Sequence, residues 1–119
     1  MLTVHHLNNS RSQRVLWLLE ELDVPYEIVR YQRLPSILAP PELKKVHPLG
    51  KSPVITDGGK TIAESGAILE YIVDTYGNGR FAPARDTAEW RQYVYWMHYA
   101  EGSAMPLLYQ KLLFSLVPK

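Results

Sequence analysis

The sequence of 119 residues contains no cysteine, which excludes disulfides, thiolate metal ligands and a protein thiol nucleophile. The sequence also has no large excess of positive or negative charge, because its 13 Lys and Arg and 12 Asp and Glu give a net charge of +1. This balance excludes a global basic field for nucleic acid or anionic membranes. No apolar run reaches the length of a membrane span, and the N-terminus lacks a signal-peptide pattern. We expect a cytoplasmic protein without a nucleic-acid partner.

The composition that remains is that of an ordinary globular protein, with 46% hydrophobic and 21% charged residues. A chain of this size can bury enough surface to form a hydrophobic core. Its length fits one domain, or one small domain together with a piece of another.

The first third of the chain predicts a strand, a helix and a second strand. Residues 2–7 and 26–31 alternate loosely between apolar and polar side chains, which is typical of strands. Between them, apolar residues recur at helical spacing over residues 11–22. A helical connection of this length favours a right-handed parallel crossover between the two strands.

The middle of the chain predicts a short helix, a hairpin and another helix. Two prolines precede residues 42–46, which can form one or two helical turns. Residues 53–56 and 60–63 flank Asp57-Gly58-Gly59, the signature of a hairpin with a glycine turn. An amphipathic helix follows from Glu64 and ends at the glycines near residue 77.

The last third is different in kind. Residues 80–86 read as a linker, and residues 87–116 show an aromatic-rich helical pattern that Pro106 should kink or break. Such an apolar helix cannot close a core by itself. We therefore expect the beginning of a helical domain whose remainder is missing; the alternative is a helix that packs back on the first domain.

This order of elements is that of the thioredoxin-like fold, and several segments resemble the glutathione transferases. The segments are SRSQRVLWLLEEL at residues 10–22, APPELKKVHPLGKSPVI at 39–55, TIAESGAILEYI at 61–72 and YWMHYAEGSAMPLL at 95–108. They look most like a bacterial and fungal subgroup with PPELKK-HPLG, ES and EGS motifs. The resemblance implies an α/β protein with a thioredoxin-like βαβαββα domain at residues 1–80. A linker at 81–86 would follow, and then the first helix of a truncated all-α C-terminal domain at 87–119.

The resemblance also implies an activity. It predicts a homodimeric glutathione S-transferase that acts in detoxification. Such an enzyme joins the thiolate of glutathione, its co-substrate, to small apolar electrophiles. Two alternatives stay open: a non-catalytic glutathione- or partner-binding module, and a glutathione-dependent peroxidase or reductase. The electrophile cannot be read, since its pocket would lie mostly in the helical domain. Whether these 119 residues are active alone is equally open.

The first candidate site is the turn before the first helix. Only the thiolate of glutathione is a good nucleophile, and a hydroxyl or amide donor at a helix N-terminus can stabilise it. The resemblance assigns this role to Ser10, with Asn9 and Ser12 as alternatives. Without a ligand, Ser10 or Asn9 would simply cap the helix.

The second candidate site is the dipeptide Ser52-Pro53 at the head of the third strand. The resemblance implies a cis proline, with the Ser52 backbone pairing with the cysteinyl part of glutathione like an added strand. Lys51 either reaches the glycyl carboxylate of glutathione or is an ordinary solvated lysine.

The third candidate site is Glu64-Ser65 at the start of the last helix of the first domain. A helix N-terminus with a serine hydroxyl suits the α-carboxylate of the γ-glutamyl group, and an adjacent glutamate suits its ammonium group. The alternative is a serine N-cap with a glutamate that favours the helix dipole.

Two further sets of residues carry weaker expectations. Tyr99 and Met105 could wall the apolar electrophile site, or the aromatic helix could be core and interface only. Among the four histidines only His5 and His6 are adjacent, and their side chains point to opposite faces of a strand. We therefore expect no metal site.

Overall fold

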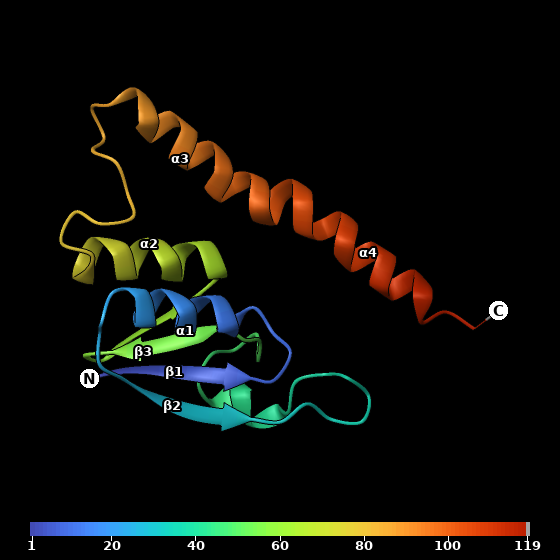
Figure 1. Ribbon diagram of the computed structural model, residues 1–119. Helices are drawn as coiled ribbons and strands as arrows, with labels where there is room; N and C mark the ends of the chain where they lie inside the picture. Colours follow the sequence, from blue (N-terminus) through green and yellow to red (C-terminus); the bar gives the residue numbers. More distant parts are fainter. Residues whose placement is uncertain (119) are drawn as a thin grey trace. The chain divides into compact units, whose positions relative to one another are not determined.

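The computed structural model describes residues 1–118, which form two compact units that divide between Asn78 and Gly79 (Figure 1). The first unit is an α/β fold, and the second consists of helices. The elements of the first unit are β1 (Leu2–Leu7), α1 (Ser12–Glu21), β2 (Tyr26–Tyr31), the 3-10 helix η1 (Pro41–Lys45), β3 (Val54–Asp57), β4 (Lys60–Ala63) and α2 (Ser65–Tyr76).

The four strands form one mixed sheet in the order β2-β1-β3-β4. β1 and β2 are parallel, with Leu2 opposite Tyr26 and Leu7 opposite Tyr31. β3 runs antiparallel to both β1 and β4. The predicted parallel crossover, hairpin and thioredoxin-like fold are therefore confirmed. The helix predicted at the centre of the chain is the five-residue η1, shorter than a regular α-helix.

Helices α1 and α2 cover the same face of the sheet, as Figure 1 shows. The reason is the hydrophobic pattern, since the apolar stripe of each helix meets the alternate residues of β1 and β3 that face it. The buried residues of this core are Leu2, Val4, Val15, Leu19, Leu22, Ile55, Ile68 and Ile72. Alternation along β1 places His6 on this helix-covered face, two residues after Val4.

The hairpin between β3 and β4 turns at two glycines that lie in the left-handed region. Gly58 has φ +52° and Gly59 has φ +81°, conformations that side chains rarely adopt. The turn lies at the end of the sheet where β1 begins, because Thr56 pairs with Thr3. The loop before β3 consequently lies at the end where β1 stops.

The second unit contains α3 (Ala88–Tyr99), a π-helical turn η2 (Ala100–Ala104) and α4 (Met105–Ser115). The helical run continues through Pro106, so the predicted break there is wrong. Pro106 lies in the first turn of α4, where a missing N–H is tolerated, and the irregularity takes the form of the π turn before it. None of the helices among the described residues is long and apolar enough to cross a membrane.

Candidate functional site

The turn after β1 carries two of the three candidate thiol-activating residues, and Arg33 holds it in place. The Arg33 backbone N–H donates to Asn8 Oδ1 at 2.8 Å, and its Nε donates to the Asn8 carbonyl oxygen at 2.9 Å. Its guanidinium also donates to the carbonyl oxygens of Asn9 and Ile37, at 2.9 and 2.8 Å. Asn9 is exposed and left-handed, with φ 49°. Three hydrogen bonds from Arg33 therefore fix the turn that presents Ser10, and two of them go to backbone carbonyl oxygens.

Ser10 belongs to a chain of hydrogen-bonded side chains. Its Oγ lies 2.6 Å from Ser12 Oγ and accepts from the Ser12 backbone N–H at 3.2 Å. Ser12 is fully buried, and its Oγ lies 2.7 Å from His6 Nδ1 and 3.3 Å from the Leu7 carbonyl oxygen. Of the two serines, half-buried Ser10 is the one that a ligand can reach, while Ser12 supports it from below.

The two adjacent histidines of β1 point to opposite faces, as the alternation of a strand predicts. His6 contacts Ser12 on the helix-covered face, whereas His5 Nδ1 lies 3.0 Å from Tyr31 Oη and its Nε2 lies 3.4 Å from Thr56 Oγ1. Burial lowers the pKa of both imidazoles, and the positive charge of Arg30 lowers the pKa of His6 further. The neutral form of the His6 imidazole is therefore favoured more than that of a free histidine side chain.

The loop before β3 lies beside the turn after β1. The Ser52-Pro53 peptide is cis, which confirms that prediction. Ser52 Oγ donates to the carbonyl oxygen of His5 at 3.0 Å and lies 3.5 Å from Ser10 Oγ. Two of the predicted site segments, far apart in the sequence, are thus brought together at one end of the sheet.

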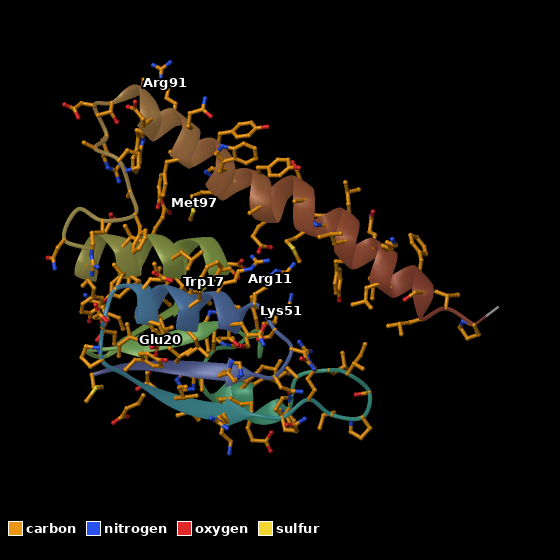
Figure 2. The ribbon with its side chains drawn as sticks, in the orientation of Figure 1. Arg11, Trp17, Glu20, Lys51, Arg91 and Met97 are labelled. Atoms are coloured by element: carbon orange, nitrogen blue, oxygen red, sulfur yellow. The ribbon has the colours of Figure 1, made fainter. Side chains whose placement is uncertain are left out.

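Lys51 follows a tight turn that needs glycine. Gly50 has φ +60°, and a Cβ there would come within 2.7 Å of Lys44 Cγ. Its N–H donates to the carbonyl oxygen of His47 at 2.9 Å, which closes the turn. Lys51 is exposed, and Figure 2 shows it at the end of the first unit where α1 begins, with Glu20 toward the opposite end.

Glu64 and Ser65 lie at the N-terminus of α2. Glu64 is the N-cap residue, in a left-handed conformation with φ 74°, and its side chain makes no capping hydrogen bond. Ser65 is the first helical residue and is only 6% exposed. The alternative prediction of a serine N-cap is therefore wrong, since Ser65 lies one position inside the helix.

Tyr99 and Met105 lie in the second unit, on either side of the π turn. Tyr99 ends α3 as part of an aromatic cluster, stacked on Tyr95 with ring centroids 6.0 Å apart and edge-on to Trp96 at 5.3 Å. Met105 is half-buried and begins α4. An apolar surface of this kind suits an apolar electrophile, and the assignment of the two residues stays a prediction.

The other polar clusters and hollows of the described residues add no second candidate. No group of three His, Asp or Glu within residues 1–118 has the arrangement of a metal site. Two open hollows, of about 570 and 650 Å³, are both lined by Asp23, Val24 and Pro25. They contain none of the predicted site residues.

Sequence reasoning missed two residues that organise this site. Arg33 is an isolated arginine after a strand, and nothing in the periodicity indicates that it binds a turn 24 residues earlier. In the sequence His6 is a candidate only for metal binding. The signal that could have found it is alternation, which puts His6 on the same face as Val4 and therefore beneath α1.

Comparison with known proteins connects this geometry to a family. The family described as "Glutathione S-transferase, N-terminal domain" matches residues 1–74. Glutathione S-transferase 3 of Schizosaccharomyces pombe is 47% identical over 116 residues, which are 98% of this chain and 48% of that protein. The chain thus spans about half the length of the curated relatives that it matches.

Solved structures agree with this result. A glutathione S-transferase from Actinobacillus pleuropneumoniae is 46% identical with a TM-score of 0.77, covering 81% of this chain and 46% of its own. The glutathione transferase URE2P8 of Phanerochaete chrysosporium, solved with oxidized glutathione, is 29% identical with a TM-score of 0.77. That match covers 99% of this chain and 55% of the solved one.

Proposed function

Because the chain belongs to the glutathione S-transferase family, we propose that its first unit binds glutathione and activates the thiol for transfer to an apolar electrophile. The observation that carries the proposal is the 3.5 Å approach of Ser10 Oγ to Ser52 Oγ. It brings a hydroxyl at the start of a helix next to the backbone that would hold the cysteinyl part of glutathione.

Ser10 supplies the donor for the sulfur. The thiol of glutathione has a cysteine-like pKa, and lowering it by roughly 2 units requires about 2.7 kcal/mol of thiolate stabilisation. A hydrogen bond to a charged acceptor contributes roughly 1.5–3 kcal/mol, and a helix N-terminus roughly 0.3–1 kcal/mol. One hydroxyl at the N-terminus of α1 can therefore supply the thiolate stabilisation that this lowering of the pKa requires. Asn9 is the second candidate, because it shares the turn.

The rest of the peptide lies along the same end of the sheet. The backbone of Ser52, with Pro53 fixed behind it, pairs with the cysteinyl unit as an added strand does. Lys51 approaches the glycyl carboxylate, which its exposed position after the Gly50 turn supports. Ser65 and the first N–H groups of α2 bind the γ-glutamyl carboxylate, and exposed Glu64 binds the ammonium group.

The electrophile site belongs to the helical part. In this proposal residues 1–80 are the glutathione-binding domain, 81–86 the linker and 87–119 the beginning of the helical domain, where Tyr99 and Met105 face the electrophile. The exposed apolar side chains of α3 and α4 support this, since none of their residues is buried. We expect the whole protein to act in the cytoplasm as a homodimer.

In the reaction the thiolate sulfur attacks an electrophilic carbon. With an aryl halide, a carbon–sulfur bond forms, the carbon–halogen bond breaks, and halide leaves with the electron pair. The thiol proton goes to solvent when glutathione binds, so no further co-reactant is needed.

The test separates this function from the alternatives. The full chain is assayed for glutathione affinity by calorimetry, for turnover of a chromogenic aryl halide, and for glutathione-dependent reduction of a hydroperoxide. Binding with aryl halide turnover supports the transferase. Binding without any turnover favours the non-catalytic module, turnover of the hydroperoxide alone favours the peroxidase, and no binding refutes the proposal.

A second measurement assigns the thiol donor. The absorbance of bound thiolate is followed against pH in the wild type and in Ser10→Ala. We expect the substitution to raise the thiol pKa by one unit or more, because one unit corresponds to about 1.36 kcal/mol. An unchanged thiol pKa would remove Ser10 from this role.

A further inference from the structure

The buried hydroxyl of Ser12 has a single proton and three polar neighbours. His6 Nδ1 lies 2.7 Å from Ser12 Oγ, Ser10 Oγ lies 2.6 Å from it, and the Leu7 carbonyl oxygen lies 3.3 Å from it. A serine hydroxyl donates one hydrogen bond and accepts at most two. The direction of each contact in this chain therefore constrains the direction of the others.

Ser10 has the same limit, and its single O–H is the group that would donate a hydrogen bond to the thiolate. If Ser10 donates to Ser12 across the 2.6 Å contact, it has no proton left for sulfur. Ser10 can donate outward only when Ser12 is the donor of that contact. The competing carbonyl of Leu7 is a poorer acceptor for Ser12, since 3.3 Å is long for a bond from a hydroxyl.

Once Ser12 donates to Ser10, its contact with His6 has one possible direction. Two lone pairs cannot face each other at 2.7 Å, so His6 Nδ1 has to carry a proton and donate it to Ser12 Oγ. We propose that His6 is a positioning residue whose Nδ1–H sets the direction of the His6–Ser12–Ser10 chain and so makes the Ser10 proton available to the glutathione sulfur. This inference rests on the role of Ser10 proposed above.

The surroundings of His6 fit a neutral imidazole with one N–H. His6 is half-buried on the face beneath α1 and pairs in register with Arg30 on β2. Burial and the charge of Arg30 lower its pKa, which favours the neutral ring. A neutral ring has two tautomers, and only the one protonated at Nδ1 is compatible with outward donation by Ser10.

The first test compares two substitutions in the full chain. His6→Leu removes the donor, whereas His6→Asn retains an amide N–H close to the position of Nδ1. We expect His6→Leu to raise the pKa of the bound glutathione thiol by nearly as much as Ser10→Ala, and His6→Asn to restore most of the lost thiolate. Glutathione affinity should change less than about twofold in each when it is measured at a pH where the bound thiol is protonated, because the γ-glutamyl anchors are untouched.

The double variant His6→Leu with Ser10→Ala provides the control for coupling. Since His6 acts through Ser10, the double variant should have the thiol pKa of Ser10→Ala alone. Two independent, additive shifts would overturn the proposal. A shift in Ser10→Ala with none in His6→Leu would overturn the role of His6 and leave the proposed function standing, whereas no shift in Ser10→Ala would remove both.

A direct measurement needs no variant at all. Ring nitrogen chemical shifts of the wild type with bound glutathione report the tautomer of His6. We expect the proton on Nδ1, and a ring protonated only at Nε2 would overturn the proposal even if His6→Leu failed to fold.

Discussion

The two ends of the sheet carry polar clusters that use their protons in opposite ways. Where β3 ends, the carboxylate of Asp57 accepts from Tyr71 Oη at 2.9 Å and from Tyr76 Oη at 2.5 Å through the same Oδ2. Where β1 ends, two hydroxyls and an imidazole follow one another, with half-buried Ser10 at the outer end. The first cluster converges on an acceptor, whereas the second, in the direction proposed above, is a chain of donors that ends at Ser10.

This difference explains why only one end is a candidate site. The phenols around Asp57 have their protons engaged by a charge of the protein itself, so the cluster ties the hairpin to α2 and stabilises the fold. The chain at Ser10 can donate a hydrogen bond outward to a ligand that brings its own negative charge. A cluster that ends in a donor recruits an anion, whereas one that ends in a carboxylate is already complete.

The strongest test of this contrast is Ser65→Ala. Loss of the hydroxyl at the start of α2 should weaken glutathione binding about tenfold or more, which corresponds to about 1.4 kcal/mol. Stability should change by less than about 0.5 kcal/mol, since alanine is a good residue in a first helical turn. Isothermal calorimetry measures the affinity, and an unchanged value would take Ser65 out of the site.

The matched change at the other end is Asp57→Asn. It keeps the shape of the side chain but replaces the charged acceptor of the two tyrosines, so we expect a loss of about 1 kcal/mol of unfolding free energy. Chemical denaturation provides that value. Glutathione affinity should be the same as in the wild type, and a loss comparable to that of Ser65→Ala would refute the division between the two ends.

The Asp57 cluster also predicts an alkaline limit to stability. The hydrogen bond to Asp57, then burial, raises the pKa of Tyr76 to about 12 from its usual 10.0. In the folded state Tyr76 therefore keeps its proton to a higher pH than in the unfolded state. The stabilisation that its hydrogen bond gives is complete below pH 10 and is lost as the pH rises toward about 12. The pKa values of Tyr26 and Tyr31 are raised as well.

The measurement is the unfolding free energy at several pH values between 8 and 12, in the wild type and in Tyr76→Phe. The substitution should flatten the alkaline decline by removing the largest of its contributions. Equal slopes in the two proteins would mean that Tyr76 is not responsible.

Much of the fold was predictable because it depends on local periodicity. The alternation in residues 2–7 and 26–31 and the glycine pair after Asp57 predicted strands and a turn that the structure contains. For Pro106 the sequence predicted a kink or a break; the break is wrong, and the structure has a π turn before the proline within one helical run. Periodicity does not report such a local change of hydrogen-bond register.

The site was less predictable, since it is assembled by contacts between distant segments. Residue type and resemblance point to Ser10, Ser52 and Ser65, yet the 3.5 Å approach of Ser10 to Ser52 joins positions 42 residues apart. The support of Ser10 by His6 depends on strand register and on the position of α1 above it. Alternation in the sequence can give the face on which His6 lies, but neither its contact with Ser12 nor the approach of Ser10 to Ser52 has a signature in the sequence alone.

The smallest expected effect comes from Asn9→Gly, and it separates the two candidate donors of the turn. Asn9 has φ 49°, so alanine there costs on the order of 1 kcal/mol, whereas glycine adopts this conformation freely. Glycine also removes the amide while the Arg33 contact to the Asn9 carbonyl oxygen remains possible. We expect stability within about 0.5 kcal/mol of the wild type and an unchanged thiol pKa, because Ser10 still donates. Thiolate absorbance against pH measures this, and a rise of one unit in Asn9→Gly with none in Ser10→Ala would transfer the activating role to the asparagine.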